Sequence, residues 1–76
     1  MDAVKPVWRL KGLTERLVEC FVKPTPHRLH AVRIVFGSET FLDEYYPDIA
    51  SAMRRATQVR DRLLKSGGWT PAGRFA

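Results

Sequence analysis

The chain of 76 residues is long enough for one small domain, since independent domains begin at about 50 residues. Its hydrophobic fraction of 45%, with 28% charged residues, is typical of a globular protein and excludes the composition of disordered chains. The single cysteine excludes an internal disulfide, and no apolar run approaches the roughly 18–20 residues that cross a bilayer. We therefore expect one soluble, cytoplasmic domain over residues 1–69 and a flexible tail over residues 70–76.

The positive charge is concentrated in the C-terminal third. Residues 1–46 carry seven Lys and Arg against six Asp and Glu, whereas residues 47–76 carry six against two. A net charge of +5 favours non-specific contact with polyanions and says nothing about fold.

Four short strands are predicted in the first half of the chain. Residues 7–10 and 16–23 alternate in polarity, and the second of these runs ends at Pro24 and Pro26, which remove backbone donors. Residues 29–36 are rich in β-branched side chains, and Gly37 and Ser38 can form a two-residue turn into a strand over residues 39–42.

A helix is predicted next, with Pro47 in its first turn and Asp48 at the positive end of its dipole. Apolar residues then recur at steps of three and four. They are Ile49, Ala52, Met53, Ala56, Val59 and Leu63. Gly67 and Gly68 should end the helix, and Trp69 should fold back onto the core.

These elements predict an α+β fold of two layers, with strand and helix order ββββα. An antiparallel meander of four strands, or of three, carries one C-terminal amphipathic helix on one face. Alternation assigns nine residues to the covered face: Trp8, Leu10, Val18, Cys20, Val22, Val32, Ile34, Phe36 and Leu42.

The opposite face of this sheet is also apolar, although one helix can cover only one face. We predict that a second copy of the chain covers it, because two-fold dimers are the commonest oligomers and a dimer adds core to a very small domain. The candidate interface consists of Leu17, Phe21, Leu29, Val35 and Phe41. The alternative is a strongly twisted sheet in which these residues lie singly exposed on edge strands.

Residues that could carry catalysis or bind a metal are few. Cys20, His27 and His30 could supply only three of the four ligands of a structural zinc site, which leaves the fourth to Glu19 or Asp43. Cys20 and His30 share the parity of the core, so we expect a buried thiol and a hydrogen-bonded histidine at the core margin. The sequence therefore predicts no enzyme, cofactor or metal site.

Nucleic-acid binding is the competing prediction. Arg54, Arg55, Arg62 and Lys65, with Arg60 at the edge, form a basic stripe that could follow a phosphate backbone. Aromatic residues that could stack on bases lie near both helix ends and on the open sheet face. They are Tyr45, Tyr46, Trp69, Phe21 and Phe41. The alternative is an ordinary solvated helix surface.

Hydrophobic anchors spread over most of the chain carry a resemblance. They are Trp8, Cys20, Phe41, Ala52, Ala56, Leu63, Leu64, Gly68 and Trp69. In this pattern the chain resembles small uncharacterised bacterial proteins with a short β-meander followed by one amphipathic helix that ends in Gly-Trp. The resemblance implies a fold and no activity.

Overall fold

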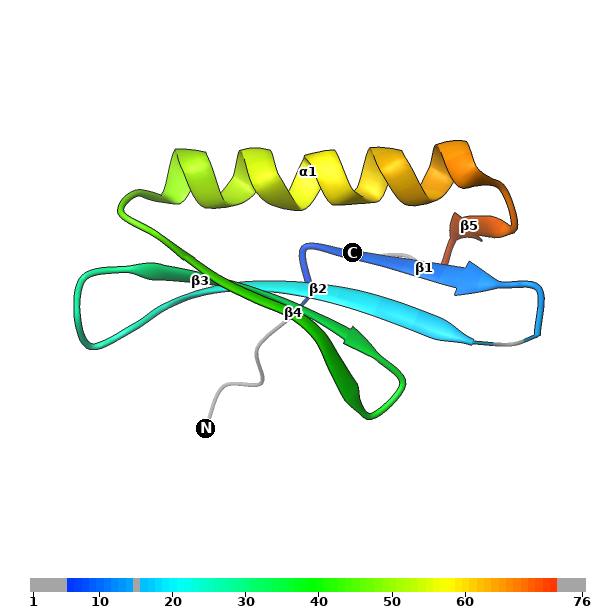
Figure 1. Ribbon diagram of the computed structural model, residues 1–76, viewed down its shortest axis with the longest axis horizontal. Coiled ribbons are helices and arrows are strands. Elements are labelled where there is room, and N and C mark those ends of the chain that lie inside the picture. Colours follow the sequence, from blue (N-terminus) through cyan, green and yellow to red (C-terminus); the bar gives the residue numbers. More distant parts are fainter. Residues whose placement is uncertain (1–5, 15, 73–76) are drawn as a thin grey trace.

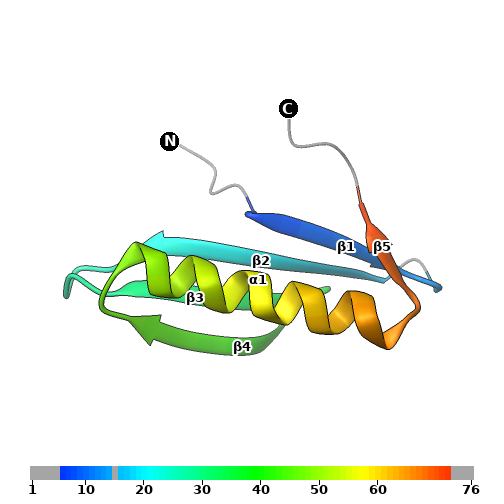
Figure 2. The same cartoon turned by 90° about the horizontal axis from the view of Figure 1, so that it is seen from above.

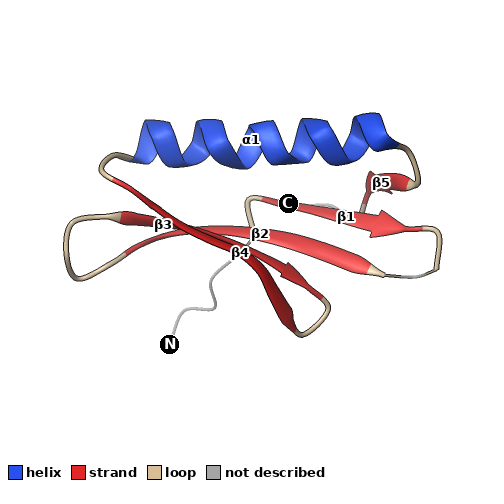
Figure 3. Ribbon diagram, in the orientation of Figure 1, coloured by secondary structure: helices blue, strands red, loops and turns tan. Residues whose placement is uncertain are grey.

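The computed structural model describes residues 6–14 and 16–72, which form one antiparallel sheet with a helix on one face (Figures 1 and 3). The strands are β1 (Trp8–Gly12), β2 (Leu17–Pro24), β3 (His30–Phe36), β4 (Glu39–Tyr46) and β5 (Trp69–Pro71), and the helix is α1 (Ile49–Ser66). Their order in the sheet is β4-β3-β2-β1-β5. The predicted two-layer α+β fold is confirmed.

Two parts of the sheet are longer than predicted. Strand β4 continues to Tyr46, which pairs with His30 at the start of β3. The predicted tail is wrong for residues 70–72, because Thr70 and Pro71 pair with β1 and the amide of Ala72 donates to the carbonyl of Arg9 at 3.0 Å. Trp69 does fold back, and its ring lies 3.1 Å from where a Cβ on Gly12 would stand. Residues 73–76 lie outside the described residues.

The core lies between the sheet and α1, and the prediction for the covered face is confirmed. Leu10, Val18, Cys20, Val32 and Ile34 are at most 1% exposed and Trp8 is 7% exposed, while Val22, Phe36 and Leu42 are partly buried against them. We refer to this as the inner face of the sheet and to the opposite side as the outer face.

Helix α1 begins at Ile49, two residues after Pro47, which was predicted to lie in the first turn, because Asp48 is the N-cap and Pro47 precedes it. The Asp48 carboxylate accepts from the amide of Ser51 at 2.7 Å, which occupies one of the free donors of the first turn. Gly67 ends the helix with φ 81°, a conformation that costs glycine little. Among the described residues, no helix has both the length and the apolar character needed to cross a bilayer.

The buried stripe of α1 is narrower than predicted. Ala52, Ala56 and Val59 are buried, but Ile49 is 52% exposed and Met53 is 39% exposed. Figure 2 shows the reason: α1 runs over the middle strands and leaves β1 and β5 to one side. The prediction that Ile49 and Met53 face the core is therefore wrong.

Strand β4 contains a bulge. Ile34 pairs with Leu42 and Val35 with Thr40, so Phe41 is an extra residue without a partner in β3. The Phe41 ring makes an edge contact with Phe36, with centroids 5.9 Å apart, and Phe36 packs against the core. Phe41 is thus joined to a side chain of the inner face.

Candidate functional site

Three of the five candidate interface residues lie in strands on the outer face. Leu17 and Phe21 come from β2, and Val35 comes from β3, where it pairs with Glu19. Leu29 precedes β3 and lies in a loop, where its carbonyl accepts from Thr25. Phe41 lies in the bulge of β4 and is 66% exposed; its ring contacts Phe36 edge-on and lines a surface hollow together with Leu17.

Two ion pairs cross the middle of the outer face. Arg9 in β1 donates from Nε and Nη2 to one oxygen of Glu19 in β2, at 2.9 and 2.7 Å. Arg33 in β3 donates to Asp43 in β4 at 3.3 Å. Both pairs join register partners on neighbouring strands, so the four charges cancel within the face.

The apolar side chains around these pairs are only partly covered. Leu17 is 38% exposed, while Phe21 and Val35 are half-buried. Ala31 is 2% exposed although no described element packs on the outer face; its register partners in the neighbouring strands are Lys23 and Tyr45. The outer face is therefore mixed, with apolar side chains around a neutral ionic centre.

The basic stripe of α1 is shorter than predicted. Arg54, Arg62 and Lys65 are exposed. Arg55 does not join them, because its Nε donates to Glu44 in β4 at 2.9 Å and its Nη1 donates to Gln58 at 2.7 Å. Arg55 thus connects the helix to the edge of the sheet and is not free to contact a phosphate.

Glu44 is the centre of this connection. The Tyr46 hydroxyl donates to it at 2.6 Å, and this bond, with that from Arg55, lowers the pKa of the Glu44 carboxyl. The same bond raises the pKa of Tyr46, because ionisation of the hydroxyl would remove the donor. The Tyr46 hydroxyl is thus bonded within the domain. The Trp69 ring also makes an internal contact, since it packs edge-on against Phe36 with centroids 5.3 Å apart.

Cys20 and His30, two of the side chains considered for chemistry, lie in the core and beside it. Cys20 is fully buried, and burial raises the pKa of its thiol to about 12. The Nδ1 atom of His30 is buried and has no hydrogen-bond partner among residues 6–14 and 16–72, so the predicted hydrogen-bonded histidine is not found. The same residues contain no group of three or more potential metal ligands.

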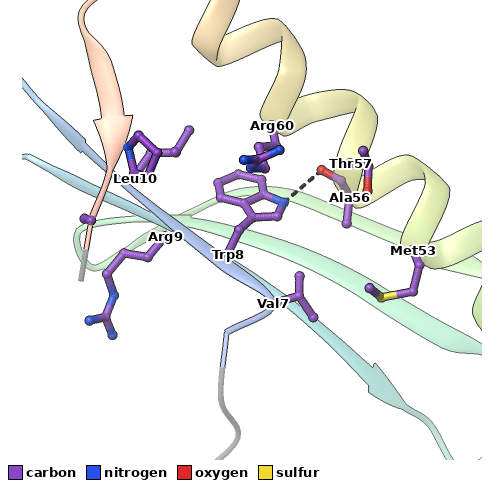
Figure 4. Close-up of a pocket in the computed structure, with 10 residues that line it drawn as sticks. Val7, Trp8, Arg9, Leu10, Met53, Ala56, Thr57 and Arg60 are labelled. Carbon is purple, nitrogen blue, oxygen red and sulfur yellow. Dashed lines mark hydrogen bonds between the residues drawn. The ribbon is translucent and has the colours of Figure 1, made fainter. Parts of the chain in front are cut away.

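A groove that the sequence did not reveal lies between α1 and β1. The Trp8 indole extends from β1 under the helix, and its Nε1 donates to the carbonyl of Ala56 at 2.8 Å (Figure 4). Beside it Met53, Thr57 and Arg60 form the helix wall of the groove. Met53 is the residue of the predicted apolar helix face that points to this groove, because it is 39% exposed while Ala52 and Ala56 are buried in the core.

Comparisons with protein-family models, with curated proteins and with solved structures found no match for this chain.

Proposed function

We propose that this protein acts by association, as a homodimer formed through the outer face of its sheet. The observation that carries the proposal is the uneven cover of the sheet: α1 packs on one face, and no described element packs on the other. Exposed Leu17 and half-buried Phe21 and Val35 form an apolar surface that a second sheet could bury.

The charges on this face favour a second copy of the chain as the partner. Because Arg9 pairs with Glu19 and Arg33 with Asp43, the centre brings no net charge into a dimer. A two-fold axis through such a face can place the acid of one copy near the base of the other.

The area of the outer face can be compared with the area that a stable dimer interface covers. The two layers are stacked along the 29 Å dimension of the domain, as Figure 1 shows, so the sheet face is bounded by 38 and 25 Å. These bounds give roughly 950 Å², and a standard stable interface covers about 800 Å² on each partner. A dimer would use nearly the whole face, and central substitutions should disrupt it.

The test combines Phe21→Glu with Val35→Lys. Phe21 pairs with Arg33 and Val35 with Glu19, so each new charge meets an opposite charge within the monomer and the fold should survive. In a dimer the same two charges would be buried, at a cost of several kcal/mol. We expect sedimentation equilibrium to give two chains for the parent and one for the variant.

The matched control is Arg62→Glu on the exposed helix surface, which should leave the dimer intact. A parent that stays a monomer at millimolar concentration contradicts the proposal, as does a doubly charged variant with the mass of two chains. Circular dichroism confirms that the variant is folded.

A second candidate function, nucleic-acid binding, is supported by the cations that remain on α1. Arg54, Arg62 and Lys65 are exposed and make no ion pair with any described residue. If they contact phosphates, replacing all three by Gln should weaken binding to every sequence alike and flatten the salt dependence. Titration of labelled DNA and RNA at low and near-physiological salt tests this, with Arg55→Gln as the comparison. Equal loss in both variants would contradict a role for the three exposed cations.

A further inference from the structure

We propose that the groove between α1 and β1 binds a small amphipathic carboxylic acid, with its hydrocarbon part between Val7 and Met53, over the exposed edge of Trp8, and its carboxylate at Arg60. Helix α1 supplies Met53, Ala56, Thr57 and Arg60 to the groove, so the proposal is independent of the dimer through the outer face.

The groove has the size and lining of a small-molecule site. Its volume is about 380 Å³, within the range of roughly 300–1,000 Å³ typical of ligand pockets. Strand β1 supplies Trp8 and Leu10, and Val7 precedes it. The helix supplies Met53 and Ala56, and Pro71 and Ala72 close the end near β5.

The floor of the groove offers carbon rather than hydrogen-bonding groups. The Trp8 N–H is already used by the Ala56 carbonyl, and the indole is 7% exposed, so only an edge of its ring reaches the groove. Val7 and Met53 flank the opening and are 37% and 39% exposed, an apolar surface that a hydrocarbon chain would remove from water.

The polar groups lie at the rim and are cationic or neutral. Thr57 and Arg60 are three residues apart on α1 and face the same side, and none of the ten lining residues is acidic. In Figure 4 the Arg60 guanidinium lies beside the Trp8 ring, whereas Arg9 extends away from the ring. Arg9 is also engaged by Glu19.

Arg60 is open to a further anionic partner. Among the described residues its ion pair is with Asp61 at 3.6 Å, and adjacent helix residues do not face one another. A guanidinium fork matches the two oxygens of a carboxylate, and Thr57 can donate a further hydrogen bond. One cation at the end of an apolar groove fits one terminal carboxylate.

The probe is decanoate, compared with decanol of the same chain length. We expect saturable binding of decanoate below its micelle concentration, measured by calorimetry and by the shift of the Trp8 indole N–H resonance. Arg60→Gln should weaken decanoate binding about tenfold and leave decanol unchanged, because a hydrogen bond to a charged group is worth about 1.5 kcal/mol or more. Arg62→Gln is the matched control and should change neither affinity.

Met53→Asp tests the apolar wall, since Met53 is partly exposed and its replacement should leave the fold intact. We expect this variant to lose decanoate binding. The proposal is overturned if decanoate does not bind, if Arg60→Gln and Arg62→Gln behave alike, or if Met53→Asp binds as well as the parent. Binding should persist in the Phe21→Glu, Val35→Lys variant, which separates this site from the dimer.

Discussion

The two faces of one sheet carry similar apolar side chains and bury them to very different degrees. On β2, Val18 and Cys20 of the inner face are fully buried, while Leu17 of the outer face is 38% exposed. The three residues come from the same strand, so the difference comes from what packs on each face. On the inner face this is α1, together with ring contacts such as that of Trp69 with Phe36.

The faces also use charge differently. Arg55 and Glu44 join the helix to the sheet edge beside the core, whereas Arg9 and Glu19, like Arg33 and Asp43, pair within the sheet on the outer face. The first pair holds two layers together, and the others neutralise a surface. The predictions that follow test this contrast.

The largest expected difference is in the reactivity of Cys20 before and after unfolding. Burial raises its pKa from 9.0 to about 12, so the thiolate is about a thousandfold rarer in the folded protein. We expect iodoacetamide to alkylate Cys20 rapidly in urea and very slowly in buffer at pH 8. Fast reaction of the folded chain would show that the inner face is open.

A matched pair of leucine truncations compares the faces directly. Leu10 is 1% exposed on the inner face, and Leu17 is 38% exposed on the outer face of the neighbouring strand. Leu10→Ala should lower the free energy of unfolding by about 2–5 kcal/mol, and Leu17→Ala by less than about 1 kcal/mol in the monomer. Urea denaturation at two protein concentrations adds a further test, because only Leu17→Ala should change the concentration dependence if the outer face dimerises.

Trp8→Phe tests the bond that fixes the helix over the inner face. The change removes the donor to Ala56 and leaves a buried carbonyl short of one partner, which should cost about 1–3 kcal/mol of unfolding free energy. Trp69→Phe is the control, since the Trp69 indole donates to no other residue of the described chain and contributes a ring contact with Phe36. Equal losses in the two variants would mean that ring volume matters and the hydrogen bond does not.

The smallest effect concerns pH. Hydrogen bonds from Tyr46 and Arg55 lower the pKa of Glu44 below 4.5, so its contribution to stability is complete above about pH 5 and is lost as the pH falls through the lowered pKa. Glu44→Gln should therefore be less stable than the parent at pH 7 and lose less stability between pH 5 and pH 3. A melting-temperature series in this interval measures the difference, and a parent and variant with parallel curves would contradict it.

The fold could be predicted because the polarity pattern has two clear periods. Alternation of apolar and polar residues identified the inner face, and steps of three and four identified α1. The surfaces were harder to predict because they depend on where the helix lies. Ile49 and Met53 have the spacing of core residues, yet they are exposed because α1 crosses the middle strands.

Ion pairs between side chains of different elements could not be predicted from the sequence pattern either. Nothing in the spacing of Arg55 distinguishes it from Arg54 or Arg62, and only its position above the edge of β4 gives it Glu44 as a partner. The fifth strand was missed because three residues that include a proline are too short to show alternation.

The bulge in β4 has a consequence for which length changes the domain can accept. Removal of Phe41 would leave Leu42 opposite Ile34 and every later residue of β4 on its present face, since Phe41 has no partner in β3. Removal of Asp43 instead would shift Glu44 and Tyr46 to the other side of the sheet and separate Glu44 from Arg55. Phe41 can therefore be deleted without changing the register of β4, whereas Asp43 cannot.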